Sequence, residues 1–380
     1  MVEAKKTQME YRYLGGTGLK VSILSWGNMI TIVGQQDKQQ FMNDSVKKCI
    51  EHGINFFDTA EMYGFGEAET LLGHAFKAVG VKREEIVVST KVFFGAGEGR
   101  DTSAEFRFGN YYRTIGTNQS GLSRKHVIEG ALGGLRRLQL DYVDIIFAHR
   151  PDRSTPLEEI CRAFSWLIDN NKAFYWGTSE WDVETIAEAI QLCQRLGLHA
   201  PVAEQCQYNM LNRKRVEKEY RSLFEKYSFG TTIWSPLAQG FLSGKYNDGK
   251  IPEDSRVTKW DPFWSNWLQY EYFSGEKKEK LIKVCLGLSE IAKAEGYSQA
   301  QLALAWCLAS RDVSTVILGI SKLEQLDENV KAVELYQKWN KTLEGKIEGL
   351  LQNPVDPTME FRTFTPAPQR REVAVFGEKK

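Results

Sequence analysis

The stretch VDIIFAHRPDRSTPLEEICRAFSWLIDNNKAFYWG, residues 143–177, contains one complete strand–helix–strand unit. Its first run, 143–148, is mostly apolar rather than alternating, which is typical of a strand covered on both faces in a parallel sheet. Apolar residues then recur at helical spacing over Leu157–Ile168, and Thr155 is placed to cap this predicted helix. The run 173–176 predicts the second strand.

The same unit recurs along the chain. The polar or small residues that end successive predicted strands are His149, Gly177, Gln207 and Ser235, separated by 28, 30 and 28 positions. These intervals are close to the roughly 30 residues of one βαβ unit. Eight strands are predicted in all, and they favour a (β/α)8 TIM barrel: Ile23–Trp26, Ile54–Phe57, Ile86–Thr90, Val143–Ala148, Ala173–Trp176, Ala203–Cys206, Thr231–Trp234 and Thr315–Leu318.

Segments outside the repeat complete this prediction. Two short strand-like ends flank a Gly-rich centre in Tyr11–Val21, which indicates an N-terminal β-hairpin. The longer intervals that follow Lys91 and Ser235 predict long loops after strands 3 and 7. A doubly wound Rossmann sheet is the alternative, but the chain lacks its G-x-G-x-x-G motif after the first strand. We therefore expect one barrel domain over residues 1–350 and a C-terminal tail over 351–380.

The composition limits which kinds of binding partner are expected. Lys plus Arg equals Asp plus Glu at 49 each, so no net field favours nucleic acid or an anionic membrane surface. No apolar run approaches the 18 or so residues of a membrane span, so we expect no membrane insertion. The six cysteines form no C-x-x-C pair, which indicates buried thiols rather than disulfides or a metal site. A cytoplasmic location is expected.

Polar side chains follow three predicted strands at the same end of the barrel. Asp58 closes one strand, Lys91 ends the next, His149 ends another, and Tyr63 lies five residues after Asp58. Asp58 could equally cap a helix, and Tyr63 could be an ordinary loop aromatic. Lys91 is harder to explain structurally, because a lysine continuing a buried strand must be paired. The carboxyl ends of barrel strands meet at one mouth, so the four are expected to share a site.

An ordered set of motifs resembles the aldo-keto reductase family over roughly residues 10 to 350. It consists of DTAEMY (58–63), GEAE (66–69), STK (89–91), HRPD (149–152), YWGTS (175–179), WSPLA (234–238) and GIS (319–321). Within that family the chain is most similar to voltage-gated potassium channel beta subunits. The segments that carry this closer similarity are GLSRKH (121–126), LQLDYVD (138–144), SGKY (243–246) and LAWCL (304–308).

The resemblance implies an NADPH-dependent reduction of an aldehyde or ketone by hydride transfer. Tyr63 would give the proton to the developing alkoxide, and Lys91 would lower the pKa of that phenol. Asp58 would hold the Lys91 ammonium in place, while His149 would orient the carbonyl or share the proton.

The resemblance also implies where the cofactor NADP(H) binds. Ser179 and Gln205 would hold the nicotinamide amide, and an aromatic ring near strand seven would stack on its face. The preference for NADP over NAD rests on Arg256 and Lys322 as partners of the 2′-phosphate. Ser321 and Glu324 also read as a plain capping box. The full set of predicted cofactor residues is Asn28, Ser179, Gln205, Trp234, Ser235, Pro236, Leu237, Ala238, Gly240, Lys245, Arg256, Gly319, Ser321, Gln325, Glu328 and Asn329.

Two other functions stay open at this point. The chain could be a channel beta subunit that binds NADP(H) and turns over slowly; the resemblance then implies a homotetramer docked on an ion channel's cytoplasmic domain. It could also be a barrel aldolase that uses Lys91 as a Schiff base. His149 stands where animal channel beta subunits tend to have Asn, which favours turnover of a small carbonyl substrate, and Glu180 stands where relatives often have Arg.

Overall fold

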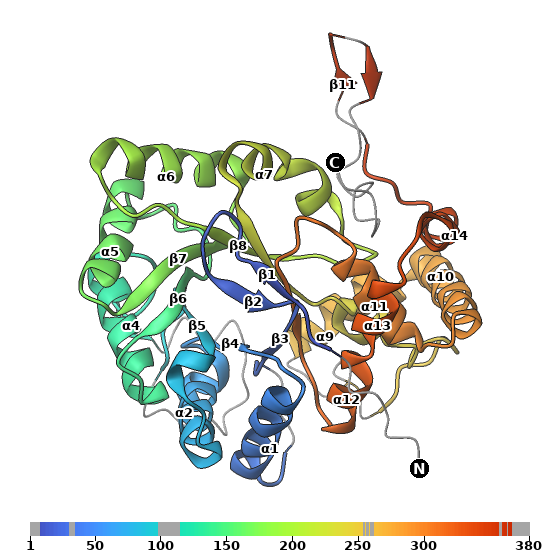
Figure 1. The fold of residues 1–380 in the computed structure, drawn as a ribbon, viewed down its shortest axis with the longest axis horizontal. Coiled ribbons are helices and arrows are strands. Elements are labelled where there is room, and N and C mark those ends of the chain that lie inside the picture. Colours follow the sequence, from blue (N-terminus) through green and yellow to red (C-terminus); the bar gives the residue numbers. More distant parts are fainter. Residues whose placement is uncertain are drawn as a thin grey trace.

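A closed barrel of eight parallel strands forms the centre of the molecule in this computed structural model, which describes residues 8–29, 35–97, 115–253, 255, 258, 262–356, 359–362 and 364–366. Strand β10 pairs with β3 through Val316 and Leu24, and this pairing closes the ring (Figure 1). The barrel prediction is confirmed, and a closed ring excludes the doubly wound sheet. The strands are β3 (Leu24–Gly27), β4 (Phe56–Asp58), β5 (Val87–Val92), β6 (Val143–Ala148), β7 (Ala173–Ser179), β8 (Ala203–Gln207), β9 (Gly230–Trp234) and β10 (Thr315–Leu318).

The predicted N-terminal hairpin is present and covers one end of the barrel. Strands β1 (Tyr11–Tyr13) and β2 (Lys20–Ser22) pair antiparallel. Leu14 and Val21 join a small core with Phe56, Val87 and Ala203, the first residues of β4, β5 and β8, so the hairpin lies at the N-terminal ends of the strands. The turn passes so close to β9 that a Cβ on Gly15 would lie 2.4 Å from the Gly230 nitrogen. The mouth at the opposite end is left for the polar residues that follow the strands.

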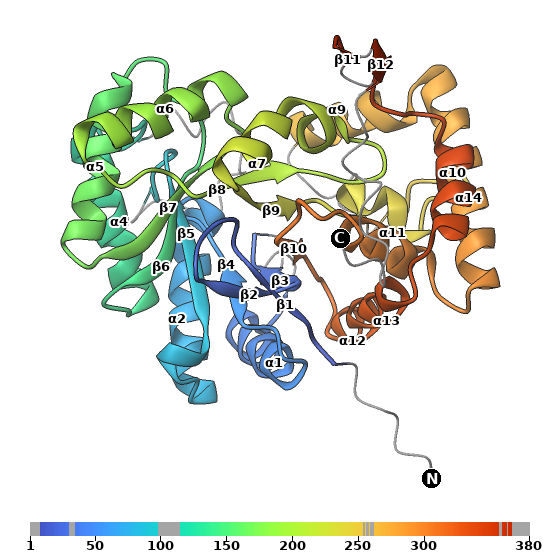
Figure 2. The same ribbon diagram turned by 45° about the horizontal axis from the view of Figure 1, so that its top comes forward.

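Helices surround the barrel, as Figures 1 and 2 show. Their apolar faces cover strands that are buried almost throughout, which explains why those strands do not alternate. Helix α5 follows the predicted stripe, but Thr155 does not cap it, because its hydroxyl donates to Asp152 instead. The helices between strands are α1 (Lys38–Glu51), α2 (Glu67–Val79), α4 (Arg124–Leu138), α5 (Leu157–Asp169), α6 (Val183–Leu196), α7 (Arg221–Tyr227), α9 (Pro262–Phe273), α10 (Gly275–Ala294) and α11 (Gln299–Leu308).

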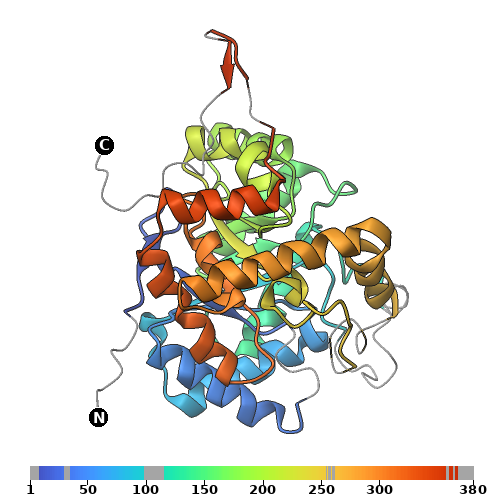
Figure 3. The ribbon, with the colours of Figure 1, turned by 90° about the vertical axis from the view of Figure 1, so that its right-hand side faces the viewer.

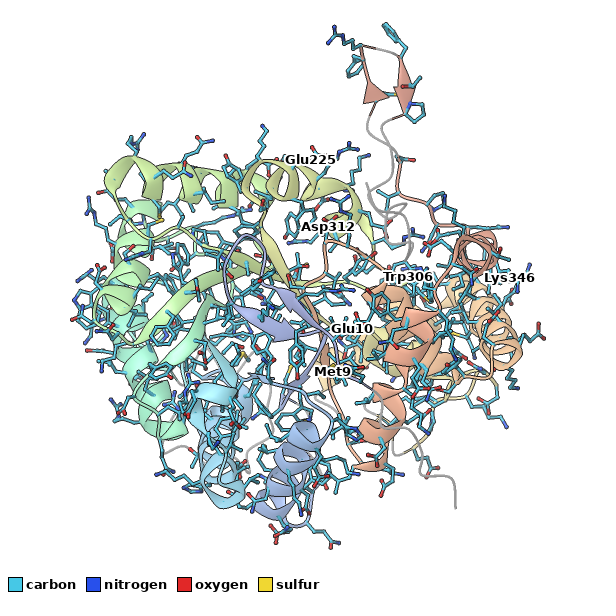
Figure 4. All side chains as sticks on the ribbon, in the orientation of Figure 1. Met9, Glu10, Glu225, Trp306, Asp312 and Lys346 are labelled. Carbon is cyan, nitrogen blue, oxygen red and sulfur yellow. The ribbon has the colours of Figure 1, made fainter. Side chains whose placement is uncertain are left out.

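The C-terminal helices form a layer on one side of the barrel. After β10 the chain continues through α12 (Glu324–Val330), α13 (Ala332–Gln337) and α14 (Lys341–Leu351). Helices α10 and α14 run side by side in Figure 3 and contact one another. Figure 4 places Trp306 of α11 on the inner side of this layer and Lys346 of α14 on its outer side. Beyond it, β11 (Met359–Glu360) and β12 (Thr365–Pro366) form a small hairpin that extends away from the barrel.

Two sequence predictions about the whole chain can be compared with this fold. All six cysteines are free and buried, as expected of thiols rather than disulfides. Among the residues that the structure describes, no helix combines the length and apolar character needed to cross a bilayer.

Candidate active site

The four predicted catalytic residues lie together at the mouth of the barrel. Asp58 is the last residue of β4, Lys91 lies near the end of β5, and His149 directly follows β6. Tyr63 begins η1 (Tyr63–Gly66), a short 3₁₀ segment in the loop after β4. All four side chains are buried, and Lys91 is fully inaccessible to solvent. Three parallel strands thus bring residues that are up to 91 positions apart into one cluster.

The Lys91 ammonium is the centre of this cluster. Its Nζ lies 2.6 Å from Oδ2 of Asp58, 2.7 Å from the carbonyl oxygen of Thr59 and 3.2 Å from Oη of Tyr63. Burial opposes the charge of the ammonium, but Asp58 and Tyr63 together more than offset this, so the pKa of Lys91 is raised. Lys91 is therefore a permanent cation with all three of its N–H bonds directed at acceptors.

Asp58 is itself held on its other oxygen. Its Oδ1 accepts from the Ser89 hydroxyl at 2.6 Å and from Nε2 of Gln205 at 3.0 Å. Ser89 lies opposite Asp58 in the register between β4 and β5, so strand pairing positions this bond. The carboxylate cannot rotate away from Lys91 without breaking these contacts.

Tyr63 faces the ammonium across the loop. The two residues after it, Gly64 and Phe65, both adopt left-handed backbone conformations, which turn the loop back toward the barrel. Burial raises the pKa of the Tyr63 phenol, and the Lys91 charge acts in the opposite direction without reversing the shift. The predicted effect of Lys91 on this pKa is therefore confirmed in direction, but removal of the phenol from water outweighs it and the net pKa is raised.

His149 completes the cluster as a neutral side chain. Burial, and then the charges of Arg150 and Lys91, hold the pKa of its imidazole well below the ordinary value. The ring packs edge-on against Tyr63 and Phe94, with centroids 5.9 and 5.1 Å away. Its buried Nδ1 has no hydrogen-bond partner within the described part of the chain.

Two of the predicted cofactor residues, Ser179 of β7 and Gln205 of β8, are bonded to each other, and Gln205 also contacts this cluster. Ser179 ends β7 and donates to the Gln205 carbonyl at 2.9 Å. The Gln205 amide reaches Asp58, so the predicted nicotinamide-binding residue and the predicted catalytic carboxylate share a hydrogen bond. On the far side of the barrel, Asn28 follows β3; its Nδ2 donates to the Ala68 carbonyl, and its Oδ1 is buried with no partner among the described residues.

The loop after β9 contains a third group of predicted cofactor residues. Trp234 ends the strand, and Pro236 and Leu237 follow Ser235 into η4 (Ala238–Ser243). Ser235, Ala238 and Gly240 all have positive φ, so the loop turns sharply several times. Gly240 has a φ of +98°, a conformation that favours glycine, and Cε and Nζ of Lys245 lie 2.9 and 3.0 Å from where a Cβ on Gly240 would stand, so that ammonium passes close to the loop backbone. A compact cationic loop of this kind fits the pyrophosphate of a dinucleotide.

The segment after β10 differs from the prediction. Helix α12 begins at Glu324 after Leu323, and the proposed capping box of Ser321 and Glu324 is wrong. Instead, Oε1 of Gln325 accepts from the amides of Ser321 and Lys322 at 2.8 and 3.3 Å. A glutamine one position further along reaches those amides because the chain makes a bend before the helix starts.

The remaining predicted cofactor residues are placed as follows. Gly319 directly follows β10, Glu328 and Asn329 lie in α12, and Asn329 is buried. Lys322 is exposed beside Ser321. Arg256 lies outside the described residues, as does most of the segment between Gly95 and Gly121 in the long loop predicted after strand 3.

Comparison with known proteins shows the family to which the chain belongs. Residues 25–348 match the model of the Aldo/keto reductase family. The chain belongs to this family. Family membership makes it an oxidoreductase of the aldo/keto reductase type.

Relatives in plants and yeast are similar over nearly the whole aldo/keto reductase chain. A "Probable voltage-gated potassium channel subunit beta" of Oryza sativa subsp. japonica is 41% identical over 358 residues, covering 93% of this chain and 100% of that protein. A protein of the same name from Arabidopsis thaliana is 41% identical over 346 residues, 91% of this chain and 97% of the relative. A "Putative voltage-gated potassium channel subunit beta" of Schizosaccharomyces pombe is 46% identical over 341 residues, 90% and 93% respectively.

Sequence reasoning missed several residues of this site. Arg150 donates to the His149 carbonyl and, at 3.2 Å, to the Ser179 hydroxyl, so it connects the ends of β6 and β7. Ser89 was overlooked although it stands two residues before Lys91, on the same face of the strand. Glu180 was noted only as a departure from relatives, although it contacts Trp234. The period-two rule could have identified Ser89; the contacts of Arg150 and Glu180 depend on neighbouring strands.

Proposed function

We propose that this aldo/keto reductase reduces the carbonyl of an aldehyde or ketone with NADPH, and that Tyr63 is the proton donor. The observation that carries this proposal is the 3.2 Å contact between Lys91 Nζ and Tyr63 Oη. In that contact the hydroxyl oxygen accepts, and the structure describes no acceptor for the phenol's own proton. A phenol whose proton is uncommitted and whose conjugate base would face a cation is suited to general-acid catalysis.

In this scheme the reduced nicotinamide supplies the hydride, which adds to the carbonyl carbon. The C=O π bond breaks toward oxygen, and the Tyr63 proton moves to that oxygen to give the alcohol. The resulting phenolate is stabilised by Lys91, whose charge is retained because Asp58 lies 2.6 Å away. The lowered pKa of His149 leaves a neutral imidazole, which can donate one hydrogen bond to the carbonyl without competing as an acid.

The chain's own residues also fit the cofactor that the family uses. Ser179 and Gln205 would hold the nicotinamide amide, Trp234 would contact its ring, and Lys245 would neutralise the pyrophosphate. The unpartnered buried Oδ1 of Asn28 at the mouth is a further acceptor for a bound group. Lys322 and Arg256 are our candidates for the 2′-phosphate, which favours NADP over NAD.

The contacts of Lys91 disfavour the aldolase alternative. Schiff-base formation requires a neutral amine with a lone pair, but burial beside Asp58 raises the pKa of Lys91. The three N–H bonds are directed at Asp58, Thr59 and Tyr63, so attack on a carbonyl would first have to break the buried ion pair.

A regulatory role is the second candidate, and the names of the three relatives favour it. In this proposal the chain works in the cytoplasm, forms a homotetramer, binds NADP(H) and docks on the cytoplasmic domain of a potassium channel. Native mass spectrometry would detect the tetramer, and co-purification with a channel from membranes would detect the partner. Absence of both would remove this second role without affecting the first.

The Tyr63→Phe variant tests the enzymatic proposal. NADPH oxidation with an aryl aldehyde should fall by about 10²- to 10⁴-fold, because the proton donor is lost while the ring's packing is kept. Fluorescence titration should show that NADPH still binds. Unchanged turnover in a variant that binds NADPH would refute Tyr63 as the acid.

A further inference from the structure

We propose that Glu180 is a positioning residue: it fixes the indole of Trp234 at the barrel mouth and biases the chain toward the oxidised cofactor, NADP⁺, relative to NADPH. The bias rests on the proposed function, since it requires that the Trp234 ring contacts the nicotinamide. The placement of the indole by Glu180 stands on contacts within the chain alone.

The Glu180 carboxylate joins three neighbouring elements. Its Oε1 accepts from Nε1 of Trp234 at 2.9 Å and from the backbone N–H of Gln207 at 2.8 Å. Its Oε2 lies 3.4 Å from Nη1 of Arg215, in the π-helical turn η3 (Arg215–Glu219) that follows β8. The side chain is 19% exposed, so these partners are only partly screened by water. The carboxylate is held by one charge-assisted bond from each of β8 and β9.

The backbone of Glu180 is strained in a way that directs this side chain. Its φ is +60°, a left-handed conformation that is uncommon for a residue other than glycine and costs about 1 kcal/mol. The Glu180 N–H donates to the Gln205 carbonyl at 3.3 Å, the same oxygen that accepts from the Ser179 hydroxyl. The turn therefore sends two consecutive side chains, Ser179 and Glu180, across the ends of β7 and β8. Such strain persists where surrounding contacts determine the conformation.

Trp234 is consequently held in one orientation. Indole has a single N–H donor, and here that donor is directed at Glu180 Oε1. Rotation of the ring by half a turn would break this bond and leave the carboxylate without one partner. The half-buried indole therefore presents a fixed face at the end of β9, on the strand next to Gln205.

A carboxylate acceptor also changes what that face attracts. An anion bonded to the indole N–H increases electron density in the ring, and a π face attracts cations. The nicotinamide ring is positively charged in NADP⁺ and neutral in NADPH. Glu180 should thus stabilise the oxidised form more than the reduced form, and Arg215, as the ion-pair partner, should limit the size of this effect.

Two substitutions separate placement from charge. Glu180→Gln keeps an oxygen acceptor for the indole but removes the negative charge, whereas Glu180→Ala removes both. Affinities of the full chain for NADP⁺ and for NADPH are measured by isothermal titration calorimetry. We expect Glu180→Gln to weaken NADP⁺ binding about three- to fivefold with little change for NADPH, in line with the size of exposed cation–π contacts. Glu217→Gln is the matched control. Glu217 lies in η3 together with Arg215, but its carboxylate pairs with Arg213 and Tyr208 rather than with Trp234.

Placement is followed without cofactor. In protein carrying 5-fluorotryptophan, with the Trp234 resonance assigned from Trp234→Phe, the ¹⁹F signal should be a single sharp line in the unaltered chain and in Glu180→Gln. In Glu180→Ala it should broaden or split. An unperturbed line in Glu180→Ala would overturn the positioning role.

The two kinds of failure are distinguishable. If the unaltered chain binds both nucleotides and the ratio of their affinities is the same in Glu180→Gln, the bias toward NADP⁺ is overturned and the proposed function stands. If the unaltered chain binds neither nucleotide, the proposed function and the bias fall together, and only the fluorine result bears on placement.

Discussion

Tyr63 and Tyr220 make an instructive pair, because both are buried phenols beside a cation. Lys91 donates to Tyr63 at 3.2 Å, and Arg215 donates to Tyr220 at 2.9 Å. Burial raises the pKa of both phenols. They differ in the use of their own proton: Tyr220 donates to the Trp181 carbonyl at 2.5 Å, whereas no described residue accepts from Tyr63.

The carboxylates beside the two phenols differ as well. Asp58 is paired with Lys91 at 2.6 Å. Glu204 accepts from Thr178 and from the Trp181 N–H and has no ion-pair partner in the described part of the chain, so burial raises its pKa to about 8. A buried phenol beside a cation is therefore not sufficient for acid chemistry. The phenol's own proton must also be uncommitted, and among the described residues this holds for Tyr63 and not for Tyr220.

The largest expected effect follows from removing that cation. Lys91→Met should reduce NADPH oxidation by roughly 10²- to 10⁴-fold and lower the free energy of unfolding by about 3–5 kcal/mol, because Asp58 is left charged and unpaired in the interior. Urea unfolding and steady-state rates measure the two effects. The double variant Lys91→Met/Asp58→Asn should recover most of the stability and none of the activity. Full stability of the single variant would contradict a paired Asp58.

Glu204→Gln tests the carboxylate near Tyr220. The folded-state pKa of about 8 lies above the ordinary 4.5, so the native state keeps a proton that the unfolded state loses. Stability from this group is complete below pH 4.5 and declines as pH rises to 8, by about 1 kcal/mol per pH unit. Urea midpoints at pH 5, 6.5 and 8 should decline less steeply in Glu204→Gln than in the unaltered chain. Parallel slopes would mean that Glu204 is ionised in the native state.

Tyr220→Phe should separate the two phenols by function. Losing this hydroxyl removes its bonds with Trp181 and Arg215, at a cost of about 1 kcal/mol in unfolding free energy, because the Trp181 carbonyl keeps its bond from Arg215 Nη1 at 3.0 Å. NADPH oxidation should stay within about twofold of the unaltered rate, because the Tyr220 hydroxyl bonds to Arg215 and Trp181 rather than to any of the four predicted catalytic residues. Tyr63→Phe should show the reverse pattern. A loss of turnover in Tyr220→Phe comparable to that in Tyr63→Phe would remove the distinction.

The smallest expected effect concerns His149. Burial lowers the pKa of His149 well below 6.5, so its stability contribution is complete above pH 6.5 and is lost as pH falls toward the folded-state value. Between pH 6.5 and 5.5 the unaltered chain should lose about 1 kcal/mol from this group. His149→Asn, which cannot titrate, should lose less over the same interval by urea unfolding. An equal loss would place the His149 pKa near its ordinary value.

Much of the fold could be predicted because its signal is local. The predicted limits of β6 and β10 are confirmed, and the other barrel strands were located to within three residues at either end. A run such as Val143–Ala148 can be recognised as a strand from sequence alone, since parallel strands that are covered on both sides are apolar on both faces. The four predicted catalytic residues, Asp58, Tyr63, Lys91 and His149, could be proposed for a related reason: residues at the carboxyl ends of such strands meet at the same mouth of the barrel. The roles assigned to these four residues and to the cofactor residues stay predictions.

Details that depend on neighbouring chain segments could not be predicted. The bond from Gln205 to Asp58 joins β8 to β4. The backbone N–H of Ser321 donates to the side chain of Gln325, whereas the sequence predicted a bond with Glu324. The net pKa of Tyr63 could not be predicted either, because the charge of Lys91 can be inferred from sequence, whereas the loss of water around the phenol cannot.

The sequence by itself determined the barrel, the hairpin at one end of it and the set of polar residues at its mouth, because each depends on residue type and spacing along the chain. Only the tertiary structure decided which phenol has an uncommitted proton, which carboxylate has a counter-ion, and that Glu180 reaches Trp234. These properties arise from burial and strand register, which place groups beside one another regardless of their distance in sequence.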